Sequence, residues 1–363
     1  MRTSRAIGRR ISGPQWLLAL AVAAASAAGV RAAAEAGPRV SEATPSTAVK
    51  WLTKAVRAPV RVSYRATETL RIQSKTGDRA QRVRVVHRVP DDTRREYLSP
   101  RGDVELIIAD DGHSHWQYSP GRREIIFSNS VRVDRELWQE RHLKRLLSNY
   151  TVSEAGQATV GGRTARVLVM TPRAGRYGPS KRLVVDEATG LILQSELATS
   201  DGATKLDSTL SDLRFEKTIP SSEFTPPAKP AKQRVIYEQI VVLPLDALVH
   251  QWKHPLMIPK RMARGYRLES ARLLRRGRHT FMHLRYFDGL NALSLFESRS
   301  SSGGSRDPRL SEVRVHGAPA AWRFLPPFWS LSWRERGLRL TLVGDLPRKE
   351  LLRIAQRSGW VSR

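Results

Sequence analysis

The chain of 363 residues contains no cysteine, so disulfide bonds and thiolate metal sites are excluded and its stability depends on packing. Acidic residues are scarce, because 34 Asp and Glu stand against 62 Lys and Arg, which gives a formal net charge of +28. Familiar catalytic patterns are also missing: the sequence has no G-x-S-x-G elbow, no Walker loop and no G-x-G-x-x-G after a strand. We therefore expect a protein that is not an enzyme, with no catalytic residue and no cofactor.

Two histidine pairs are weak candidates for metal binding. His113 and His115 lie two residues apart beside an Asp-Asp-Gly turn, and His250 and His254 lie four residues apart with no acid between them. Two histidines without a third nitrogen ligand make a poor zinc site, and the second pair lacks the glutamate of an H-E-x-x-H motif. We expect no metal site.

The N-terminus predicts export. Four arginines and no acid within the first ten residues precede the apolar run "WLLALAVAAASAAGV", which is short for a membrane span, and small residues follow it around Ala32 and Ala34. This order is typical of a cleaved signal peptide, which we assign to residues 1–32, and an uncleaved membrane anchor is the alternative. The Arg9-Arg10 pair leaves the choice between Sec and twin-arginine export open.

The exported part stays strongly basic. Removing the five arginines of residues 1–32 from the net charge of +28 leaves +23. In a cytoplasmic protein this balance would suggest nucleic acid, but an exported protein meets anionic lipid headgroups, lipopolysaccharide phosphates or acidic segments of other proteins. We expect no nucleic-acid partner. The arginines are scattered over alternating, strand-like stretches, so part of the excess is also consistent with solvated sheet faces.

Hydrophobic periodicity predicts an α+β fold. A short helix is expected at 46–56, with Ser46 or Thr47 as N-cap, and a second helix at 134–150, with Asp134 as cap and Tyr150 in its apolar stripe. The stretch "RLVVDEATGLILQSELAT" alternates on both sides of a turn and predicts a β-hairpin. Strands are expected within 60–74, 81–89, 93–99, 104–112, 115–119, 123–128, 163–173, 182–199 and 204–216.

One curved antiparallel sheet with helices packed over one face would enclose an apolar cavity if the sheet does not close fully. Alternation within the strands nominates the residues of that face. The candidate ligand-contacting residues are Tyr64, Trp116, Tyr118, Phe127, Leu183 and Leu193. The alternative is that these side chains fill an ordinary core.

A composition shift divides the chain. The stretch 219–234 is rich in proline, serine and lysine, and we place a linker at 225–234 between an N-terminal domain at 46–224 and a C-terminal domain at 235–363. The last residues predict a helix that follows Asp345 as cap, with Leu351, Leu352 and Ile354 as its apolar stripe.

The cations of that helix are candidates for partner binding. Arg348, Lys349 and Arg353 could steer an acidic partner segment, and a solvated helix face is the alternative.

Several stretches carry a resemblance to a known family, among them "YTVSEAGQATVGGRTARVLVMTPR", "YGPSKRLVVDEATGLILQSELATSDG", "LSDLRFEKTIPSSEFTPP" and "YFDGLNALSLF". With the order of the two domains, they resemble the RseB/MucB family of sigma-E regulatory proteins, whose N-terminal domain is similar to the lipoprotein carriers LolA and LolB. The resemblance implies a LolA-like half-barrel covered by helices and a smaller C-terminal α+β domain. The basic "PAKPAKQR" and the aromatic "WRFLPPFWSLSW" depart from the family's pattern.

The resemblance also implies a function. Members of the family are periplasmic negative regulators of an envelope-stress sigma factor, which bind the periplasmic part of a membrane-spanning anti-sigma factor and release it when a lipid, a mislocalised lipoprotein or a lipopolysaccharide component occupies the large domain. The alternative is a periplasmic carrier of lipoproteins or lipids of the LolA type. A C-terminal domain of roughly a hundred residues or more, large enough to fold independently, favours the regulator. The identity of the ligand and the choice between a monomer and a homo-oligomer stay open.

Overall fold

The computed structural model describes residues 46–74, 77–130, 135–227, 234–277, 279–299, 313–325 and 327–361. We call residues 46–227 the N-terminal unit and residues 234–361 the C-terminal unit. The predicted signal peptide, the predicted Asp134 cap and residues 228–233 of the predicted linker lie outside the described residues.

The N-terminal unit is mostly β-structure with two α-helices among its described residues. Its elements are α2 (Thr47–Arg57), η1 (Ala58–Val60), β1 (Tyr64–Ser74), β2 (Arg79–Arg88), β3 (Asp92–Leu98), β4 (Val104–Asp110), β5 (Ser114–Ser119), η2 (Pro120–Arg122), β6 (Glu124–Asn129), α3 (Arg135–Asn149), β7 (Tyr150–Val160), β8 (Arg163–Pro172), β9 (Ser180–Asp186), β10 (Ile192–Ala198), β11 (Thr204–Phe215) and η3 (Ser221–Phe224).

The C-terminal unit is also mostly β-structure, with two α-helices among its described residues. Its elements are β12 (Arg234–Val242), α4 (Leu245–Trp252), β13 (Leu256–Pro259), β14 (Arg267–Arg276), β15 (His279–Phe287), β16 (Ala292–Arg299), β17 (Val313–Val315), β18 (Ala318–Leu325), β19 (Phe328–Glu335), β20 (Leu338–Gly344), α5 (Arg348–Gln356) and β21 (Ser358–Val361).

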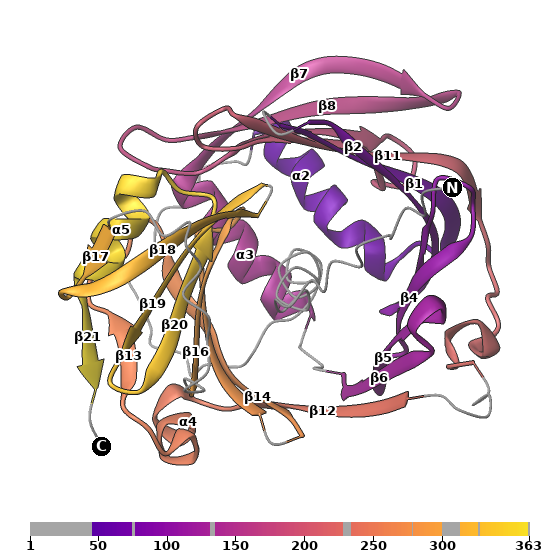
Figure 1. Cartoon of the computed structure of the whole chain (residues 1–363). Helices are drawn as coiled ribbons and strands as arrows, with labels where there is room; N and C mark the ends of the chain where they lie inside the picture. Colours follow the sequence, from indigo (N-terminus) through magenta and orange to yellow (C-terminus); the bar gives the residue numbers. More distant parts are fainter. Residues whose placement is uncertain are drawn as a thin grey trace, which may run out of the picture.

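A single sheet of 19 strands runs through both units. Its spatial order is β7-β8-β9-β10-β11-β1-β2-β3-β4-β5-β6-β12-β14-β15-β16-β20-β19-β18-β17. Neighbouring strands are antiparallel except β6 and β12, which are parallel and join the two units. In Figure 1 the strands follow a ring, from β7 and β8 at the top through β4 to β6 on the right and β12 below to β16 and β20 on the left, with α2 and α3 inside it.

Helix α2 forms where the sequence predicts it. The Ser46 hydroxyl accepts a hydrogen bond from the Val49 amide at 3.4 Å, which caps the helix. Ala48, Leu52 and Ala55 follow at helical spacing and are buried against β8 and β9. The amphipathic pattern therefore sets which face of α2 contacts the sheet.

The hairpin of β9 and β10 is confirmed, but one of its residues faces the other way. The register shifts between Ile192 and Gln194, which leaves Leu193 as the extra residue of a β-bulge. Leu183 packs beneath α2 and α3, whereas Leu193 packs on the opposite face with Val184. The expectation that Leu183 and Leu193 share one apolar face is therefore wrong, because the bulge reverses the alternation.

Helix α3 ends one residue earlier than its apolar stripe predicts. Asn149 is its last residue, and Tyr150 begins β7, a strand that the periodicity did not separate from the helix. Leu146 and Tyr150 are both buried in the cluster below α2.

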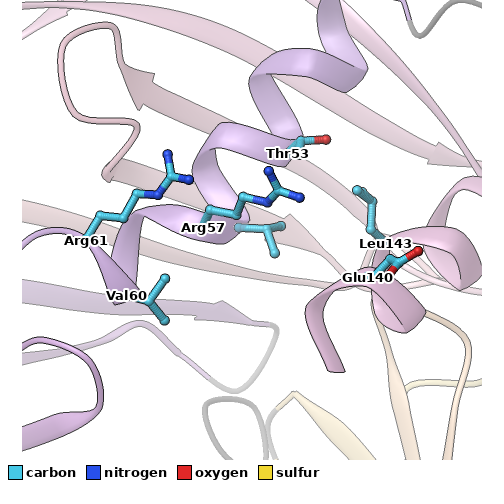
Figure 2. A pocket seen from close by; sticks show the side chains of 7 residues that line it. Thr53, Arg57, Val60, Arg61, Glu140 and Leu143 are labelled. Carbon is cyan, nitrogen blue, oxygen red and sulfur yellow. The ribbon is translucent and has the colours of Figure 1, made fainter. Parts of the chain in front are cut away.

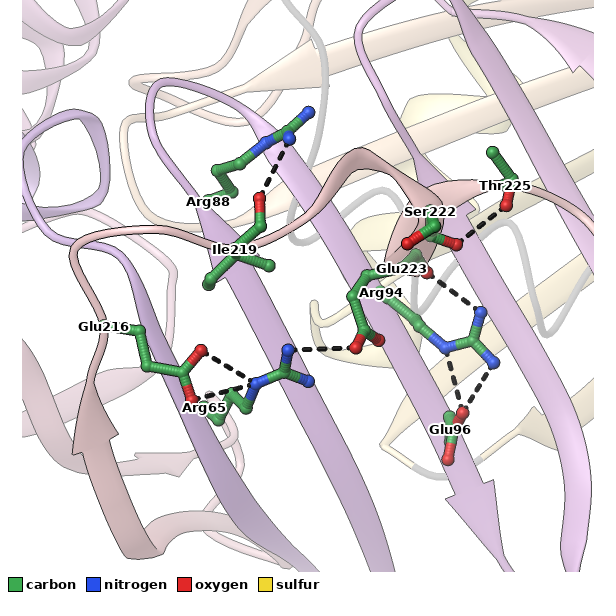
Figure 3. Close-up of polar contacts among 9 residues, drawn as sticks. All are labelled: Arg65, Arg88, Arg94, Glu96, Glu216, Ile219, Ser222, Glu223 and Thr225. Atoms are coloured by element: carbon green, nitrogen blue, oxygen red, sulfur yellow. Dashed lines mark hydrogen bonds and ion pairs between the residues drawn. The ribbon is translucent and has the colours of Figure 1, made fainter.

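A short segment, Glu216 to Pro227, runs across one face of strands β1 to β3, and three arginines of these strands bind it there (Figure 3). Arg65 donates to the carboxylates of Glu216 and Glu223 at 3.0 Å, Arg88 donates to the Ile219 carbonyl, and Arg94 donates to the Glu223 carbonyl, each also at 3.0 Å. The chain is thus fixed to the sheet up to the point where the predicted linker begins.

The core of the C-terminal unit lies on one face of strands β14 to β20, beneath α4 and α5. Leu351 and Ile354 of α5 are buried in it and Leu352 is partly buried, as the apolar stripe predicts. The predicted cap is wrong: the N-cap residue of α5 is Pro347, and the Asp345 carboxylate instead accepts hydrogen bonds from Ser200 of the other unit.

Candidate functional site

A cavity of about 260 Å³ lies between α2 and α3 on the inner side of the curved sheet. Its lining residues are Thr53, Val56, Arg57, Val60, Arg61, Glu140 and Leu143. Figure 2 shows Arg57 extending from α2 toward Leu143 and Glu140 of α3. Apolar walls with two guanidinium groups at the rim fit an amphiphile with an anionic end better than a neutral or cationic molecule.

The charges at the cavity are unequal. A hydrogen bond from Lys144, 2.7 Å away, holds the pKa of Glu140 below its usual range, and the Arg57 charge adds to this effect. The guanidinium groups of Arg57 and Arg61 have no hydrogen-bond acceptor within the part of the chain that the structure describes. The rim therefore keeps a positive charge, since Glu140 is already paired with Lys144.

The six residues predicted to contact a ligand lie in several separate places. Trp116 is fully buried and donates to the Phe224 carbonyl at 2.8 Å, while Tyr118 and Phe127 are partly buried beside it. Leu183 lies beneath α2 and α3, and Leu193 on the other face of the sheet.

Tyr64 is partly buried, with its ring 5.4 Å from that of His87. Of the six, only Leu183 lies beneath the helices that border the cavity. The residues that line the cavity come mainly from α2, η1 and α3, and hydrophobic periodicity did not predict them as ligand contacts. Whether any of the six contacts a ligand stays a prediction.

A buried polar joint connects the two units at the turn between β15 and β16. The Asp288 carboxylate accepts a hydrogen bond from the Tyr150 hydroxyl at 2.7 Å and from the amides of Leu290 and Asn291 at 2.8 and 2.6 Å. The Asn149 carboxamide donates to the Asp288 carbonyl at 2.6 Å. These bonds hold the end of α3 against the "YFDGLN" turn, the stretch that also carries the family resemblance.

Glycines make this close approach sterically feasible. At Gly289, whose φ is +108°, a Cβ atom would lie 2.3 Å from the Leu146 backbone nitrogen. At Gly265 it would lie 2.6 Å from the Asn149 side chain. Both positions also have positive φ, so any other residue would combine backbone strain with a clash.

A second part of the joint is Asp345, which follows β20. Its carboxylate accepts hydrogen bonds from the Ser200 amide and hydroxyl, both at 3.1 Å. Burial raises the pKa of Asp345 to about 6, and the nearby charges of Asp201 and Asp288 act in the same direction, against the Ser200 hydrogen bonds. Burial likewise raises the pKa of Asp288, although amide and tyrosine donors oppose it.

A third contact between the units involves a buried carboxylate on β14. The Glu269 side chain contacts His142 of α3 and Arg285 of β15, and all three side chains are almost fully buried. Arg285 also lies over the Phe287 ring, with 4.8 Å from its guanidinium carbon to the ring centroid. Helix α3 is thus attached to the C-terminal sheet along much of its second half.

The three predicted partner-binding cations have different surroundings. Arg353 is bound by the Glu350 carboxylate one helical turn earlier, with 2.8 Å between Nε and Oε2. Arg348 is exposed and its guanidinium lies over two tryptophan rings, and Lys349 is exposed beside it. Only Arg348 and Lys349 are therefore free to meet a partner charge.

Two further features bear on function. In the described ranges, no group of three or more histidine, aspartate and glutamate side chains is arranged to hold a metal ion. None of the helices in the described part of the chain has both the length and the apolar character that crossing a membrane requires.

The chain is similar to a known protein family. The family described as "MucB/RseB N-terminal domain" matches residues 47–228, half of the chain. Among curated proteins no match was found.

Solved structures that match this chain include two MucB complexes and a LolA superfamily protein, and of these only the MucB structures have TM-scores above 0.5. In the Pseudomonas aeruginosa MucA/MucB complex, the similar chain is 19% identical, and the alignment covers 88% of this chain and 100% of that one with a TM-score of 0.58. MucB in complex with MucA(peri) is also 19% identical, covering 87% and 100% with a TM-score of 0.56. A LolA superfamily protein from Nitrosomonas europaea is 14% identical and covers 50% and 99% with a TM-score of 0.27.

Proposed function

Because the chain belongs to the MucB/RseB family, we propose that it is a periplasmic regulator that binds the periplasmic segment of a membrane-spanning anti-sigma factor. In this role it shields that segment from proteolysis and thereby restrains an envelope-stress sigma factor. It has no catalytic activity of its own. The cleaved signal peptide at 1–32 delivers it to the periplasm.

The observation that carries this proposal is the similarity of fold along nearly the whole chain to MucB, a protein crystallised with MucA and with MucA(peri). The similarity extends through the C-terminal unit, well beyond the 47–228 family match. A large basic excess supports an acidic partner segment, since complementary charge accelerates association and disfavours wrong partners.

We further propose that the cavity between α2 and α3 senses a lipid. Val56, Val60 and Leu143 offer an apolar wall to an acyl chain, and Arg57 and Arg61 offer charge to a phosphate or carboxylate. The ligand is a lipid, a mislocalised lipoprotein or a lipopolysaccharide component, and its binding releases the partner. The cavity touches α3, and α3 contacts the C-terminal unit through His142 and Asn149, so a shift of this helix would reach both units.

Partner binding is tested with the exported chain, residues 33–363, and the periplasmic segment of the single-span anti-sigma protein from the same genome. Calorimetry is expected to show saturable binding and protection of the segment from protease. The absence of binding by the folded chain would contradict the regulator function.

Lipid binding is tested with monomeric lysophosphatidylglycerol as the probe. Replacing both Arg57 and Arg61 by alanine should weaken binding about tenfold or more, since each loses a charge-assisted contact. Arg101→Ala, in the exposed turn after β3, is the matched control and should bind as the original chain does.

The alternative function, a carrier of the LolA type, is favoured by the cavity alone. A carrier would bind the lysolipid and pass it to acceptor vesicles without binding the anti-sigma segment. The two functions are therefore separated by the same pair of experiments.

A further inference from the structure

The hairpin of β18 and β19 has a turn of unusual composition. Tight hairpin turns favour glycine, asparagine and aspartate, but here the chain reads "WRFLPPFW" across the turn. Trp322, Phe324, Phe328 and Trp329 are all only partly buried. This stretch is one of the two that depart from the family pattern, and the proposed function does not by itself explain it.

The aromatic rings of this hairpin form a compact group. The rings of Trp322 and Trp329 are perpendicular, with 6.2 Å between centroids, and Phe324 lies 4.9 Å from Trp329. Each strand contributes one tryptophan to this group. Trp322 and Trp329 both pack against the core of the C-terminal unit. The core therefore holds the rings rigidly while leaving part of each exposed.

Arg348, the first residue of α5, lies over both tryptophans. Its guanidinium carbon is 4.9 Å from the centroid of Trp322 and 5.1 Å from that of Trp329. The side chain is exposed, and within the described ranges no carboxylate or carbonyl acceptor is assigned to it. Contact with two rings restricts the position of the guanidinium, while its N–H groups stay available to a ligand from outside.

A guanidinium held in this way is suited to recognising a carboxylate. Its planar set of donors can bind two oxygens at once, and contact with the two tryptophans reduces the entropy that the arginine loses on binding. Tryptophan and arginine are also the residue types that most often dominate protein interfaces. Lys349, exposed beside Arg348, adds a second positive charge.

We propose that Trp322, Trp329 and Arg348 form a docking platform for an acidic, extended segment of a protein partner that carries an apolar side chain next to a carboxylate. The inference rests on the proposed function, because it names the surface that would hold the anti-sigma segment. Charge complementarity argues for this occupant: Arg348 and Lys349 are exposed and uncompensated, and the nearest acid of α5, Glu350, is buried and bound to Arg353. The partly exposed apolar rings supply a contact surface for the neighbouring side chain.

The matched control lies in the same unit. Arg336 stacks on Trp360 with 5.1 Å from its guanidinium carbon to the ring centroid, but it faces a single tryptophan. Arg348→Lys and Arg336→Lys therefore make the same change, which keeps the charge and removes the planar donor set. Thermal unfolding of both variants should match the original chain, because both arginines lie at the surface.

The experiment follows the indole N–H signals of the exported chain by NMR, assigned through tryptophan-to-phenylalanine variants. Two probes are added: a soluble peptide with alternating acidic residues and one phenylalanine, and the same peptide with lysine for each acid. We expect the acidic peptide to shift the signals of Trp322 and Trp329 and not that of Trp360. Arg348→Lys should weaken this binding about fivefold or more, and Arg336→Lys should leave it unchanged.

Three results would overturn the platform. These are equal shifts with the lysine peptide, equal affinity of Arg348→Lys and the original chain, or shifts of the two indoles by phosphatidylglycerol vesicles but not by the acidic peptide, which would assign the hairpin to a membrane surface. The peptide measurement does not depend on the anti-sigma segment. If that segment fails to bind the original chain, the proposed function fails, while the acidic peptide still decides the platform.

Discussion

At the scale of single residues, the contact between the two units depends on hydroxyl groups that donate to buried carboxylates. Asp288 accepts from Tyr150, and Asp345 accepts from Ser200. The joint is therefore sensitive to loss of a single donor and to the ionisation of either acid.

Tyr150→Phe removes one donor to Asp288 without removing the ring. We expect the free energy of unfolding to fall by about 1 to 3 kcal/mol, because a buried acid loses a hydrogen-bond partner. Urea unfolding measures this change. Tyr237→Phe is the control: Tyr237 is 66% exposed and should change stability by less than about 0.5 kcal/mol, and an equal loss in the two variants would contradict the assigned role of Tyr150.

Asp345 predicts a specific dependence on pH. Its pKa is about 6 in the folded chain against an ordinary value of 3.8, so its ionised form costs folding free energy above pH 6. The cost shrinks as the pH falls from about 6 toward 4, so acidification stabilises the joint by about 2 to 3 kcal/mol at most. Asp345→Asn, which cannot ionise, should show a flatter profile of unfolding free energy between pH 7 and pH 4. Parallel profiles for the two proteins would show that Asp345 does not titrate in this range.

At the scale of elements, the sequence is informative where a pattern is local. Helix α2, the hairpin of β9 and β10 and the apolar stripe of α5 form where periodicity and turn residues predict them. These elements depend on neighbours within a few positions, such as the Ser46 cap of α2, which lie within the window that a periodic pattern samples.

The features that the sequence does not predict depend on distant contacts. The bulge at Leu193 follows from the pairing of two strands, and periodicity alone continues the alternation through it. Asp345 precedes a helix and has the chemistry of a cap, yet its partner is Ser200, 145 positions away. Tyr150 fits the helical stripe, but its hydroxyl meets Asp288 of the other unit. For the same reason the cavity residues on α2 and α3 were not nominated.

Substitutions of Gly289, in the turn between β15 and β16, test how closely α3 packs against this turn. Gly289→Ala should destabilise the fold by about 2 kcal/mol or more, because its Cβ would meet the Leu146 backbone and no flexible side chain can give way. Gly317→Ala, at a φ of +81° with open space around it, carries the backbone strain alone and should cost about 1 kcal/mol. Thermal unfolding compares the two; equal costs would mean that the approach of α3 is looser than the structure shows.

At the scale of the whole molecule, the curved sheet brings the two proposed binding sites onto one framework. The cavity lies beside α3, and α3 is attached to the C-terminal sheet through His142, Asn149 and the neighbouring Tyr150. A lipid that moves α3 would therefore act on the unit that is proposed to hold the partner. The coupling requires that the two ligands favour different positions of this helix.

The net charge predicts how partner affinity responds to salt. Residues 33–363 carry a formal charge of +23, so association with an acidic segment should be assisted by attraction over the whole surface. We expect the dissociation constant to rise about tenfold or more between ~50 and ~500 mM salt, mainly through slower association. Surface plasmon resonance at several salt concentrations measures both rates, and a constant association rate would rule out electrostatic steering.

The central claim is that this protein holds an anti-sigma segment and releases it when a lipid binds. The most direct measurement is the dissociation constant of the exported chain for the periplasmic segment of its anti-sigma protein, with and without monomeric lysophosphatidylglycerol. The account predicts saturable binding that weakens about tenfold or more with the lipid, and a loss of this response when Arg57 and Arg61 are replaced by alanine. Binding that is unaffected by lipid, or no binding by the folded chain, would contradict it.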